Sequence, residues 1–489
     1  MSTSIGPTST GSRERARGNP PAEPRVTADA GATRSPADVT VDAPVGIVRA
    51  PAAYVRDFEE VDIELGAKQP AWARALRRTA LERFLTHGFP TTKIEDWHFT
   101  SVARIAESDF LTLTAPGGDV RDGDVAPFTF GRTEWSTLTF VNGRFDPELS
   151  DLVEMPAGVR VLPMDSAWRE MPELLERYVG KIASFDGAAE AFTALNTAYM
   201  VDGAVVHVAK DVTVAKPIHL LFISDAMAAR GVMYPRNLIV VDQNAKATVL
   251  ETYAAVGDAH YFTNAVTEVA IADGATLTHL KLQRESQRAF HVGTIDVRQG
   301  GDSHYVSFLF GIGGSLSRSN IYTKLRGEGC GATLNGLYML DGDQHMDHQT
   351  LIEHEKPNCY SREVYKGVLD GTSHGVFNGK VYVDPDAQKT DGKQTNNTLL
   401  LSEKAQVDTK PQLEIFADDV KCTHGATVGR LDQTALFYMK SRGVGAELAR
   451  QLLTYAFAAD VIETIEVDAV REGLERLTLD RFTKGEDGG

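Results

Sequence analysis

Apolar residues recur at helical spacing near both ends of the chain. In the stretch "AWARALRRTALERFLTHGFP" (71–90) they recur every three or four positions until Gly88 and Pro90, which predicts one amphipathic helix with a defined end. The stretch "STLTFVNGRF" predicts a hairpin around Asn142 and Gly143. The segments "PELLERYVG" and "AAEAFTALNTAYM" also have a helical pattern. We therefore expect a small mixed α/β domain before residue 200.

Beyond Gly203 the pattern changes to short β-branched runs separated by Gly, Asp and Asn turns. Five of these runs align so that a small hydroxyl residue falls in register, namely Thr248, Thr276, Ser303, Thr333 and Ser373. A recurring small polar turn before a short strand is typical of a stacked solenoid, whose coils cover one another's apolar faces. We predict a parallel β-helix. A β-sandwich is the alternative, although it has no reason to repeat one turn at a fixed period.

These patterns divide the chain into four predicted regions. Residues 1–45 are rich in Ser, Thr, Pro, Gly and Ala and lack an apolar core, so we expect a disordered tail. Residues 46–200 are the N-terminal mixed domain, and residues 201–440 are the β-helix. Residues 441–489 form a C-terminal helical domain. The predicted fold class is therefore mainly β, with helical regions on either side.

The C-terminal stretch "GVGAELARQLLTYAFAADVIETI" predicts a helix that is apolar along one face. Because a solenoid end exposes unpaired strand edges, we expect this helix to cap the end of the β-helix. A largely apolar helix can equally bind a partner protein. The residues expected to do so are Val444, Leu448, Leu452, Tyr455 and Phe457.

Composition narrows the classes of partner. The chain has 489 residues and a formal net charge of -17, which disfavours nucleic acid and anionic lipid and favours proteins as partners. No apolar run approaches the roughly 18 residues of a membrane helix, and no secretory signal pattern is present. Only three cysteines occur, which predicts free thiols in a reducing compartment such as the cytoplasm.

The stretch "DDVKCTHGATVG" places Cys422 and His424 two residues apart in a predicted strand. Side chains alternate along a strand, so the two are expected to point the same way. With Lys421 and the imidazole nearby, the thiolate of Cys422 is expected to be favoured, which predicts a site for iron, zinc or a transferred sulfur. The alternative is a buried thiol beside a hydrogen-bonded histidine in a β-rich core. Two ligands alone do not complete a tetrahedral site.

A second cluster of metal-compatible residues is rich in histidine and contains His345, Asp347, His348, Glu353, His354, Cys359 and Glu363. Its spacings match neither a His-Glu-x-x-His helix nor a Cys-x-x-Cys knuckle. Polar positions and turns of the solenoid are the alternative interpretation. The sequence has no phosphate-binding loop or dinucleotide fingerprint, so we expect no nucleotide to bind this chain.

Four stretches resemble the SufB/SufD family of the SUF iron-sulfur cluster assembly system. They are "FPTTKIEDWHFT", "QHMDHQTLIEHEKPNCYSREVYKGVLDG", "VDTKPQLEIFADDVKCTHGATVG" and "SRGVGAELARQLLTYAFAADVIE". The resemblance covers roughly residues 51–475, and within the family it is stronger to SufD than to SufB. Gly425 stands where SufB proteins carry a glutamate after the histidine, and Asn397 stands near the position of the SufB-type cysteine.

The resemblance implies a right-handed parallel β-helix with helical regions at both ends, acting as a non-enzymatic scaffold subunit. It implies pairing with a SufB-like paralogue through the β-helix, and docking of the SufC ATPase, which binds the ATP, through the C-terminal helices. Cys422 and His424 match positions at the SufB–SufD interface, where a transient iron or nascent cluster shared with SufB is expected; His424 is the stronger candidate ligand and iron-entry residue. The alternatives are a SufB-type paralogue, a stand-alone metal-dependent enzyme and a carbohydrate-active β-helix enzyme.

Overall fold

The computed structural model of this chain describes residues 47–48, 52–115, 117–131 and 134–483. The predicted tail of residues 1–45 lies outside them. The chain divides into two units after residue 42, and every described residue belongs to the second unit. The predicted region boundaries at residues 45, 200 and 440 stay predictions.

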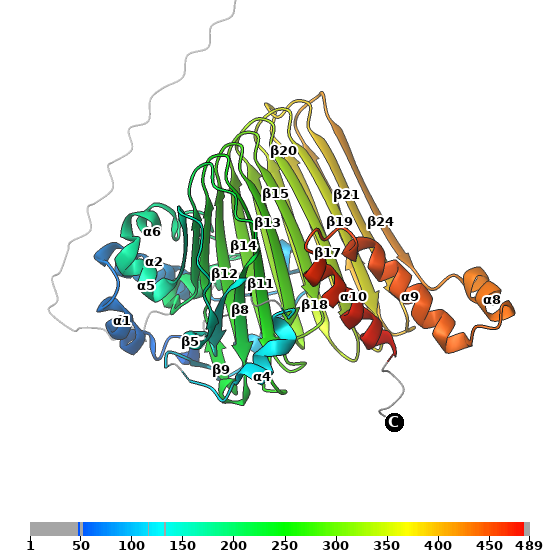
Figure 1. Cartoon of the computed structure of the whole chain (residues 1–489), viewed down its shortest axis with the longest axis horizontal. Helices are drawn as coiled ribbons and strands as arrows, with labels where there is room; N and C mark the ends of the chain where they lie inside the picture. The colour runs from blue at the N-terminus through cyan, green and yellow to red at the C-terminus, as the bar shows by residue number, and fades with distance from the viewer. Residues whose placement is uncertain (1–46, 49–51, 116, 132–133, 484–489) are drawn as a thin grey trace, which may run out of the picture. The chain divides into compact units, whose positions relative to one another are not determined.

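Two mainly parallel sheets form the two faces of a β-solenoid, which confirms the predicted fold class (Figure 1). The first sheet has twelve described strands: β3 (Leu111–Thr112), β6 (Val159–Pro163), β7 (Ala204–Val208), β9 (Gly231–Met233), β10 (Arg236–Val241), β12 (Phe262–Ile271), β14 (Phe290–Gln299), β16 (Leu316–Leu325), β18 (His345–His354), β20 (His374–Val383), β22 (Gln406–Thr409) and β23 (Gln412–Ile415). The second sheet has ten described strands: β4 (Ser136–Val141), β5 (Arg144–Asp151), β8 (Ile218–Ser224), β11 (Lys246–Ala255), β13 (Thr276–Arg284), β15 (His304–Gly311), β17 (Gly331–Leu340), β19 (Tyr360–Leu369), β21 (Asp391–Leu400) and β24 (Lys421–Gly429). A short antiparallel pair joins β1 (Ile47–Val48) to β2 (Phe89–Pro90).

The chain alternates between the two sheets, so that each turn adds one strand to both. Along the second sheet Thr276 pairs with His304, His304 with Gly331, and Gly331 with Tyr360. One turn therefore takes about 30 residues, within the range of known solenoid repeats. The predicted period is confirmed.

A repeated corner fixes this period. A residue with positive φ stands two positions before each of these second-sheet strands, as at Asn244, Gly274, Gly329 and Asn358. The backbone N–H of Asn244 donates to the carbonyl of Asp273, and the corners of later turns repeat this bond. Gly and Asn tolerate left-handed backbone better than other residues, which is why the turns recur in the sequence as small polar residues.

The alignment of hydroxyl residues is wrong in detail. Thr248 pairs with Thr278 rather than with Thr276, and Ser303 belongs to the corner one residue before its strand. The residues after the positive-φ positions form a column of small buried side chains: Ala245, Ala275, Ser303, Cys330, Cys359 and Thr390. Cys330 and Cys359 thus fill a structural position at the corner.

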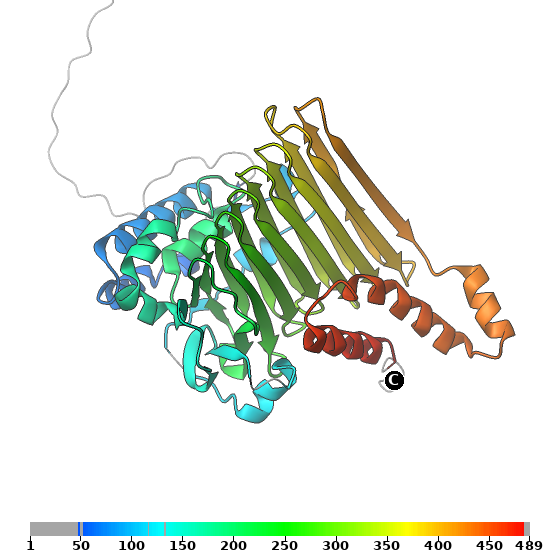
Figure 2. The same cartoon turned by 45° about the horizontal axis from the view of Figure 1, so that its top comes forward.

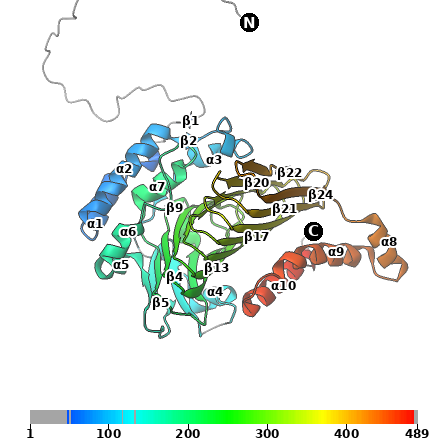
Figure 3. The same cartoon turned by 90° about the horizontal axis from the view of Figure 1, so that it is seen from above.

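The helices that precede the solenoid cover the outer face of the first sheet (Figure 3). The exception is the short helix that carries Val125, which packs with Leu221 and Ile223 of the second sheet. The described α-helices before the solenoid are α1 (Phe58–Gly66), α2 (Ala71–His87), α3 (Ala103–Ala106), α4 (Asp122–Val125), α5 (Met164–Glu170), α6 (Pro172–Tyr178) and α7 (Ala191–Tyr199); short 3-10 turns are η2 (Ala52–Tyr54), η3 (Glu95–Trp97), η4 (Ala126–Phe128) and, within the solenoid, η5 (Ala226–Ala228). α2 ends at His87, and Asn142 and Gly143 both have positive φ between β4 and β5. The predicted helix and hairpin are confirmed.

The C-terminal helices α8 (Gln433–Ser441), α9 (Ala446–Ile462) and α10 (Asp468–Thr483) follow the last strand. α9 packs against β17 and β19, on the outer face of the second sheet. The Lys366 ammonium holds it there by donating to the backbone carbonyl of Phe457 and pairing with Asp460. The predicted cap is therefore wrong, because α9 packs Ala458, Val461 and Ile462 on the side of the solenoid rather than across its end. No described helix is long and apolar enough to cross a membrane.

Candidate functional site

The last turn of the solenoid lacks a neighbour on one side (Figure 2). Among the described strands, β24 pairs with β21 alone, and β22 and β23 pair with β20 alone. Strand edges of this kind present backbone donors and acceptors that can pair with another chain. The sequence-predicted Cys422 and His424 both lie on β24.

Alternate backbone N–H groups of β24 point toward β21 and toward the free edge. The N–H of Lys421 donates to the carbonyl of Thr390, next to β21. Because backbone groups of successive strand residues point to opposite sides, the N–H groups of Cys422, His424 and Ala426 point to the free edge. These groups are available for a further parallel strand.

Cys422 and His424 point into the lumen of the solenoid, as the alternation of a strand predicts. Cys422 is in register with Gly392 and packs against a cluster that includes Val381 on the opposite sheet. His424 is in register with Gln394, which also faces the lumen. Cys422 is half-buried and His424 is exposed, because no further turn covers them. The prediction that the two side chains share a face is confirmed.

The predicted stabilisation of the Cys422 thiolate is wrong. Burial raises the pKa of the Cys422 thiol, and the Asp391 carboxylate raises it further, while a backbone hydrogen bond from Gly392 opposes both. The Lys421 side chain cannot compensate, since neighbouring residues of a strand point to opposite faces. In the isolated chain this sulfur is therefore a weak nucleophile at neutral pH.

A polar pair lies below His424 in the lumen, with Gln394 one turn away and Glu363 two turns away. The side-chain amide of Gln394 donates to a carboxylate oxygen of Glu363 at 2.6 Å, and the other Glu363 oxygen is buried without a hydrogen-bond partner in the described structure. Burial raises the pKa of Glu363 to about 7. Sequence reasoning grouped Glu363 with the histidine-rich stretch and missed Gln394. The solenoid period is the signal that links them, because Glu363, Gln394 and His424 occupy one register column.

The three histidines of the second cluster do not meet. His345 contacts Thr100 on the outer face, at 2.9 Å, whereas His348 lies in the lumen between the rings of Tyr338 and Tyr365. His354 faces the same side as His348 but is six residues along the strand, about 20 Å away at strand rise. Burial lowers the pKa of each histidine to about 4. A shared metal site is excluded by this spacing, and the interpretation as polar positions of the solenoid holds.

Metal coordination at the open end is incomplete within this chain. No group of three or more His, Cys, Asp or Glu residues in the described part of the chain is arranged to hold a metal ion. Cys422 and His424 offer a sulfur and a nitrogen, which suit iron and zinc. Any further ligands would have to come from another molecule at the free edge.

The C-terminal helices expose an apolar surface away from the solenoid. Leu448 and Leu452 of α9 are exposed, together with Phe437 and Tyr438 of α8, which sequence reasoning missed. We call these four residues the α8–α9 patch. Of the other predicted partner-binding residues, Val444 and Tyr455 are half-buried. Phe457 packs in the cluster between α9 and the second sheet, with the Lys366 ammonium 4.8 Å from its ring centroid.

Two models of known protein families match this chain. Residues 222–457 match the SufBD core domain of SUF-system iron-sulfur cluster assembly, and residues 49–220 match the SufBD N-terminal region. The chain belongs to the SufB/SufD family. This family membership favours an iron-sulfur assembly protein over the alternative interpretation as a carbohydrate-active β-helix enzyme.

Individual relatives support the SufD resemblance within the SufB/SufD family. The chain is 34% identical to the iron-sulfur cluster assembly protein SufD of Escherichia coli over 84% of this chain and 92% of the relative. It is 28% identical to SufD of Bacillus subtilis, over 86% of this chain and 95% of that protein. A SufBD family protein of Synechocystis is 34% identical over 79% of this chain and 86% of the relative.

The buried Glu363 predicts a measurable pH dependence of stability. Its folded pKa of about 7 exceeds the ordinary value of 4.5, so the unfolded chain loses this proton first as pH rises. Glu363 therefore lowers the free energy of unfolding progressively between these two pH values, by up to about 3 kcal/mol above the upper one. Glu363→Gln should remove this contribution while keeping an acceptor for Gln394.

The check is urea unfolding of both proteins from pH 4.5 to pH 8. We expect the variant to be more stable than the parent at pH 8 and the difference to vanish near pH 4.5. A difference that does not change with pH would mean that Glu363 is not a buried acid with a raised pKa.

Proposed function

We propose that this SufB/SufD-family chain is a non-enzymatic scaffold subunit of the SUF complex. It pairs through the open end of its solenoid with a SufB-like paralogue and docks a SufC-like ATPase through its C-terminal helices. The observation that carries the proposal is the unpaired last turn with Cys422 and His424 facing its lumen. The cytoplasm is the proposed compartment, because all three cysteines are free thiols.

The composition of the last turn supports pairing with another solenoid. Three large apolar side chains of the last turn are exposed, namely Val428 of β24, Ile415 of β23 and Phe416 directly after β23. A partner strand would satisfy the free N–H and C=O groups, and side chains of the partner's first turn would cover these apolar groups. A paralogue with the same fold offers a matching strand spacing and a matching lumen.

Pairing would also complete the metal site. A partner turn stacked on β24 would place its own lumen side chains one strand spacing, about 4.8 Å, from Cys422 and His424. Iron or a nascent cluster is the cargo of this site, and His424 is the main ligand from this chain. The joined ends would exclude water from the iron or cluster. Because each chain supplies only part of the ligand set, separation of the two chains would release the bound metal.

The α8–α9 patch is the proposed dock for the SufC-like ATPase. Exposed aromatic and leucine side chains on one surface are typical of a protein interface. α9 is fastened to the second sheet through Lys366, so movement of a docked ATPase would act on the solenoid. We infer that ATP-driven movement opens and closes the joined end, a two-state coupling between ATP binding and cluster release.

A proline at the free edge should block pairing. Ala426→Pro removes a backbone N–H that points away from β21, and proline is tolerated at such edge positions. We expect the variant to fold, to keep the SufC-like ATPase and to lose the SufB-like paralogue when the three proteins are co-expressed and purified through this chain. Native mass spectrometry of the purified complex gives the stoichiometry.

Ala426→Val is the matched control for this experiment, because it changes the same side chain and keeps the N–H donor. It should retain both partners. If Ala426→Pro retains the paralogue at the parent stoichiometry, the edge of β24 is not the pairing surface.

Removal of the His424 imidazole should impair cluster assembly more than complex formation. In the reconstituted three-protein complex we expect His424→Ala to slow cluster formation about tenfold or more, as loss of metal-site groups usually does. The rate is followed by absorbance of the cluster after addition of iron and a sulfide source. Thr423→Ala, which alters the opposite face of β24, should leave the rate unchanged. Equal rates for the parent chain, His424→Ala and Thr423→Ala would show that His424 is not a ligand of the site.

Charge on the α8–α9 patch should release the ATPase selectively. Leu448→Glu with Leu452→Glu places two carboxylates on an apolar contact, which is expected to weaken docking by about a hundredfold. Both side chains are exposed in this chain, so folding should be unaffected. Loss of the paralogue together with the ATPase, or retention of both, would contradict separate docking surfaces.

A further inference from the structure

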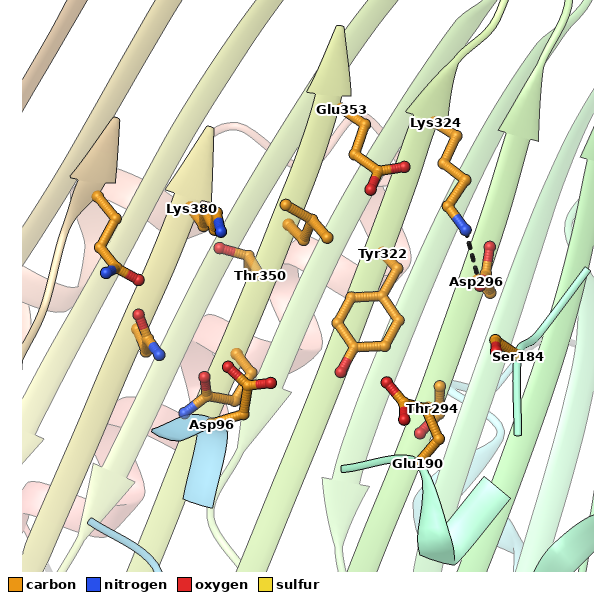
Figure 4. A pocket seen from close by; sticks show the side chains of 14 residues that line it. Asp96, Ser184, Glu190, Thr294, Asp296, Tyr322, Lys324, Thr350, Glu353 and Lys380 are labelled. Atoms are coloured by element: carbon orange, nitrogen blue, oxygen red, sulfur yellow. Dashed lines mark ion pairs between the residues drawn. The ribbon is translucent and has the colours of Figure 1, made fainter. Parts of the chain in front are cut away.

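A cavity lies on the outer face of the first sheet and reaches β23 in the last turn. It is bounded by β14, β16, β18, β20 and β23 of the first sheet and by the N-terminal segments that carry Asp96, Ser184 and Glu190 (Figure 4). Its volume is about 260 Å³, enough for a small organic molecule. Neither the interface at β24 nor the α8–α9 patch uses any of its residues.

The cavity is rich in acceptors and carboxylates. Asp96, Glu190, Asp296 and Glu353 line it, and Tyr322 lies in its middle. The four carboxyl groups outnumber the two lysines of the lining, Lys324 and Lys380, so the cavity carries net negative charge when they are ionised.

The two lysines of the cavity do not cancel this charge. Lys380 forms an ion pair at 2.7 Å with Glu414, which is not among the lining residues. Lys324 forms an ion pair with Asp296 at 3.8 Å, a distance too long for a hydrogen bond (Figure 4). Burial raises the pKa of Glu353, and the positive charge of Lys324 opposes this shift. The two lysines therefore offset only part of the charge of the four carboxylates.

Two buried oxygens in the cavity wall are unsatisfied. Asp296 is only 1% exposed, and its Oδ1 has no hydrogen-bond partner in the described structure. Asn378 is 7% exposed, and its side-chain oxygen is likewise without a partner there. Buried polar atoms are nearly always paired, because leaving one unpaired destabilises the fold. Both oxygens belong to side chains that line the cavity, where a donor-bearing ligand would satisfy them.

The pKa values of three carboxyl groups in the cavity are raised, as expected for buried carboxyl groups that are not fully neutralised by cations. Burial raises the pKa of Asp296 to about 7, and burial also raises the pKa values of Glu190 and Glu353. The attraction of Lys324 opposes the shift at Asp296 but does not cancel it. A bound cation would stabilise all three carboxylates in their charged form.

The distance between the carboxylates of the cavity favours an elongated ligand over a single metal ion. No three acidic, His or Cys residues of the described chain come close enough to hold one metal ion. Asp296 lies on β14 and Glu353 on β18, with β16 between them, so their strands are about 10 Å apart. A linear molecule with a cationic group at each end matches this separation better than a single ion.

We propose that this cavity binds a linear aliphatic diammonium ligand, with one ammonium at Asp296 and the other toward Glu353, and Glu190 beside the connecting chain. Its methylene groups lie along the ring of Tyr322. The two proposed ammonium contacts lie on β14 and β18, away from β24 and from the α8–α9 patch.

The test is isothermal titration calorimetry of the full chain with 1,4-diaminobutane and 1,5-diaminopentane. Butylamine, which has one ammonium and the same carbon chain as the first, is the ligand control. We expect one diamine per chain to bind, and butylamine to bind about tenfold or more weakly because one charged contact is lost.

Two variants test the residues. Asp296→Asn and Glu353→Gln each remove the charge at one end of the site with little change of shape, and each should weaken diamine binding about tenfold. Glu472→Gln, which removes an exposed carboxylate from α10, should leave binding unchanged. Glu353→Gln keeps the test decisive if Asp296→Asn fails to fold.

Several results would overturn the proposal: no diamine binding, binding that both cavity variants leave intact, or equal affinity for butylamine. Magnesium or ferrous ion binding in place of the diamine would overturn it as well, since it would show a compact metal site. None of these results bears on pairing through β24, which is measured by complex stoichiometry.

Discussion

A parallel solenoid cannot satisfy its own last strand. Within the part of the chain that the structure describes, every inner turn pairs on both sides, whereas β24 pairs only with β21 and the strands opposite it pair only with β20. The backbone groups at this end need water or another chain as partners. Since α9 and α10 follow the side of the solenoid, the last turn stays open. The location of the candidate site follows from this constraint.

The register of the strands determines what the open end contains. Each turn adds about 30 residues, as is usual for a solenoid repeat, so residues far apart in sequence form columns through the lumen. His424, Gln394 and Glu363 are three successive members of one column. A polar column is costly in a closed core but suits a lumen that opens to a partner. The pairing surface and the buried polar groups are therefore one continuous feature.

Local patterns in the sequence predict much of this structure. The helix that ends at His87 and the period of the coils depend on neighbouring residues, and both follow from spacing alone. The register of the hydroxyl residues and the position of α9 depend on contacts between distant segments, such as that of Lys366 with Asp460, and sequence reasoning predicted them wrongly. The shared direction of Cys422 and His424 was predictable from strand alternation, whereas the raised pKa of Cys422 depends on burial in the last turn.

The most direct measurement is hydrogen–deuterium exchange of β24, in this chain alone and in the complex with a SufB-like paralogue. The account predicts that the amides of His424 and Ala426 exchange rapidly in the isolated chain and become protected in the complex, while the amide of Lys421, bonded to Thr390, is protected in both. Unchanged exchange at His424 and Ala426 in a complex that has formed would contradict pairing through the open end.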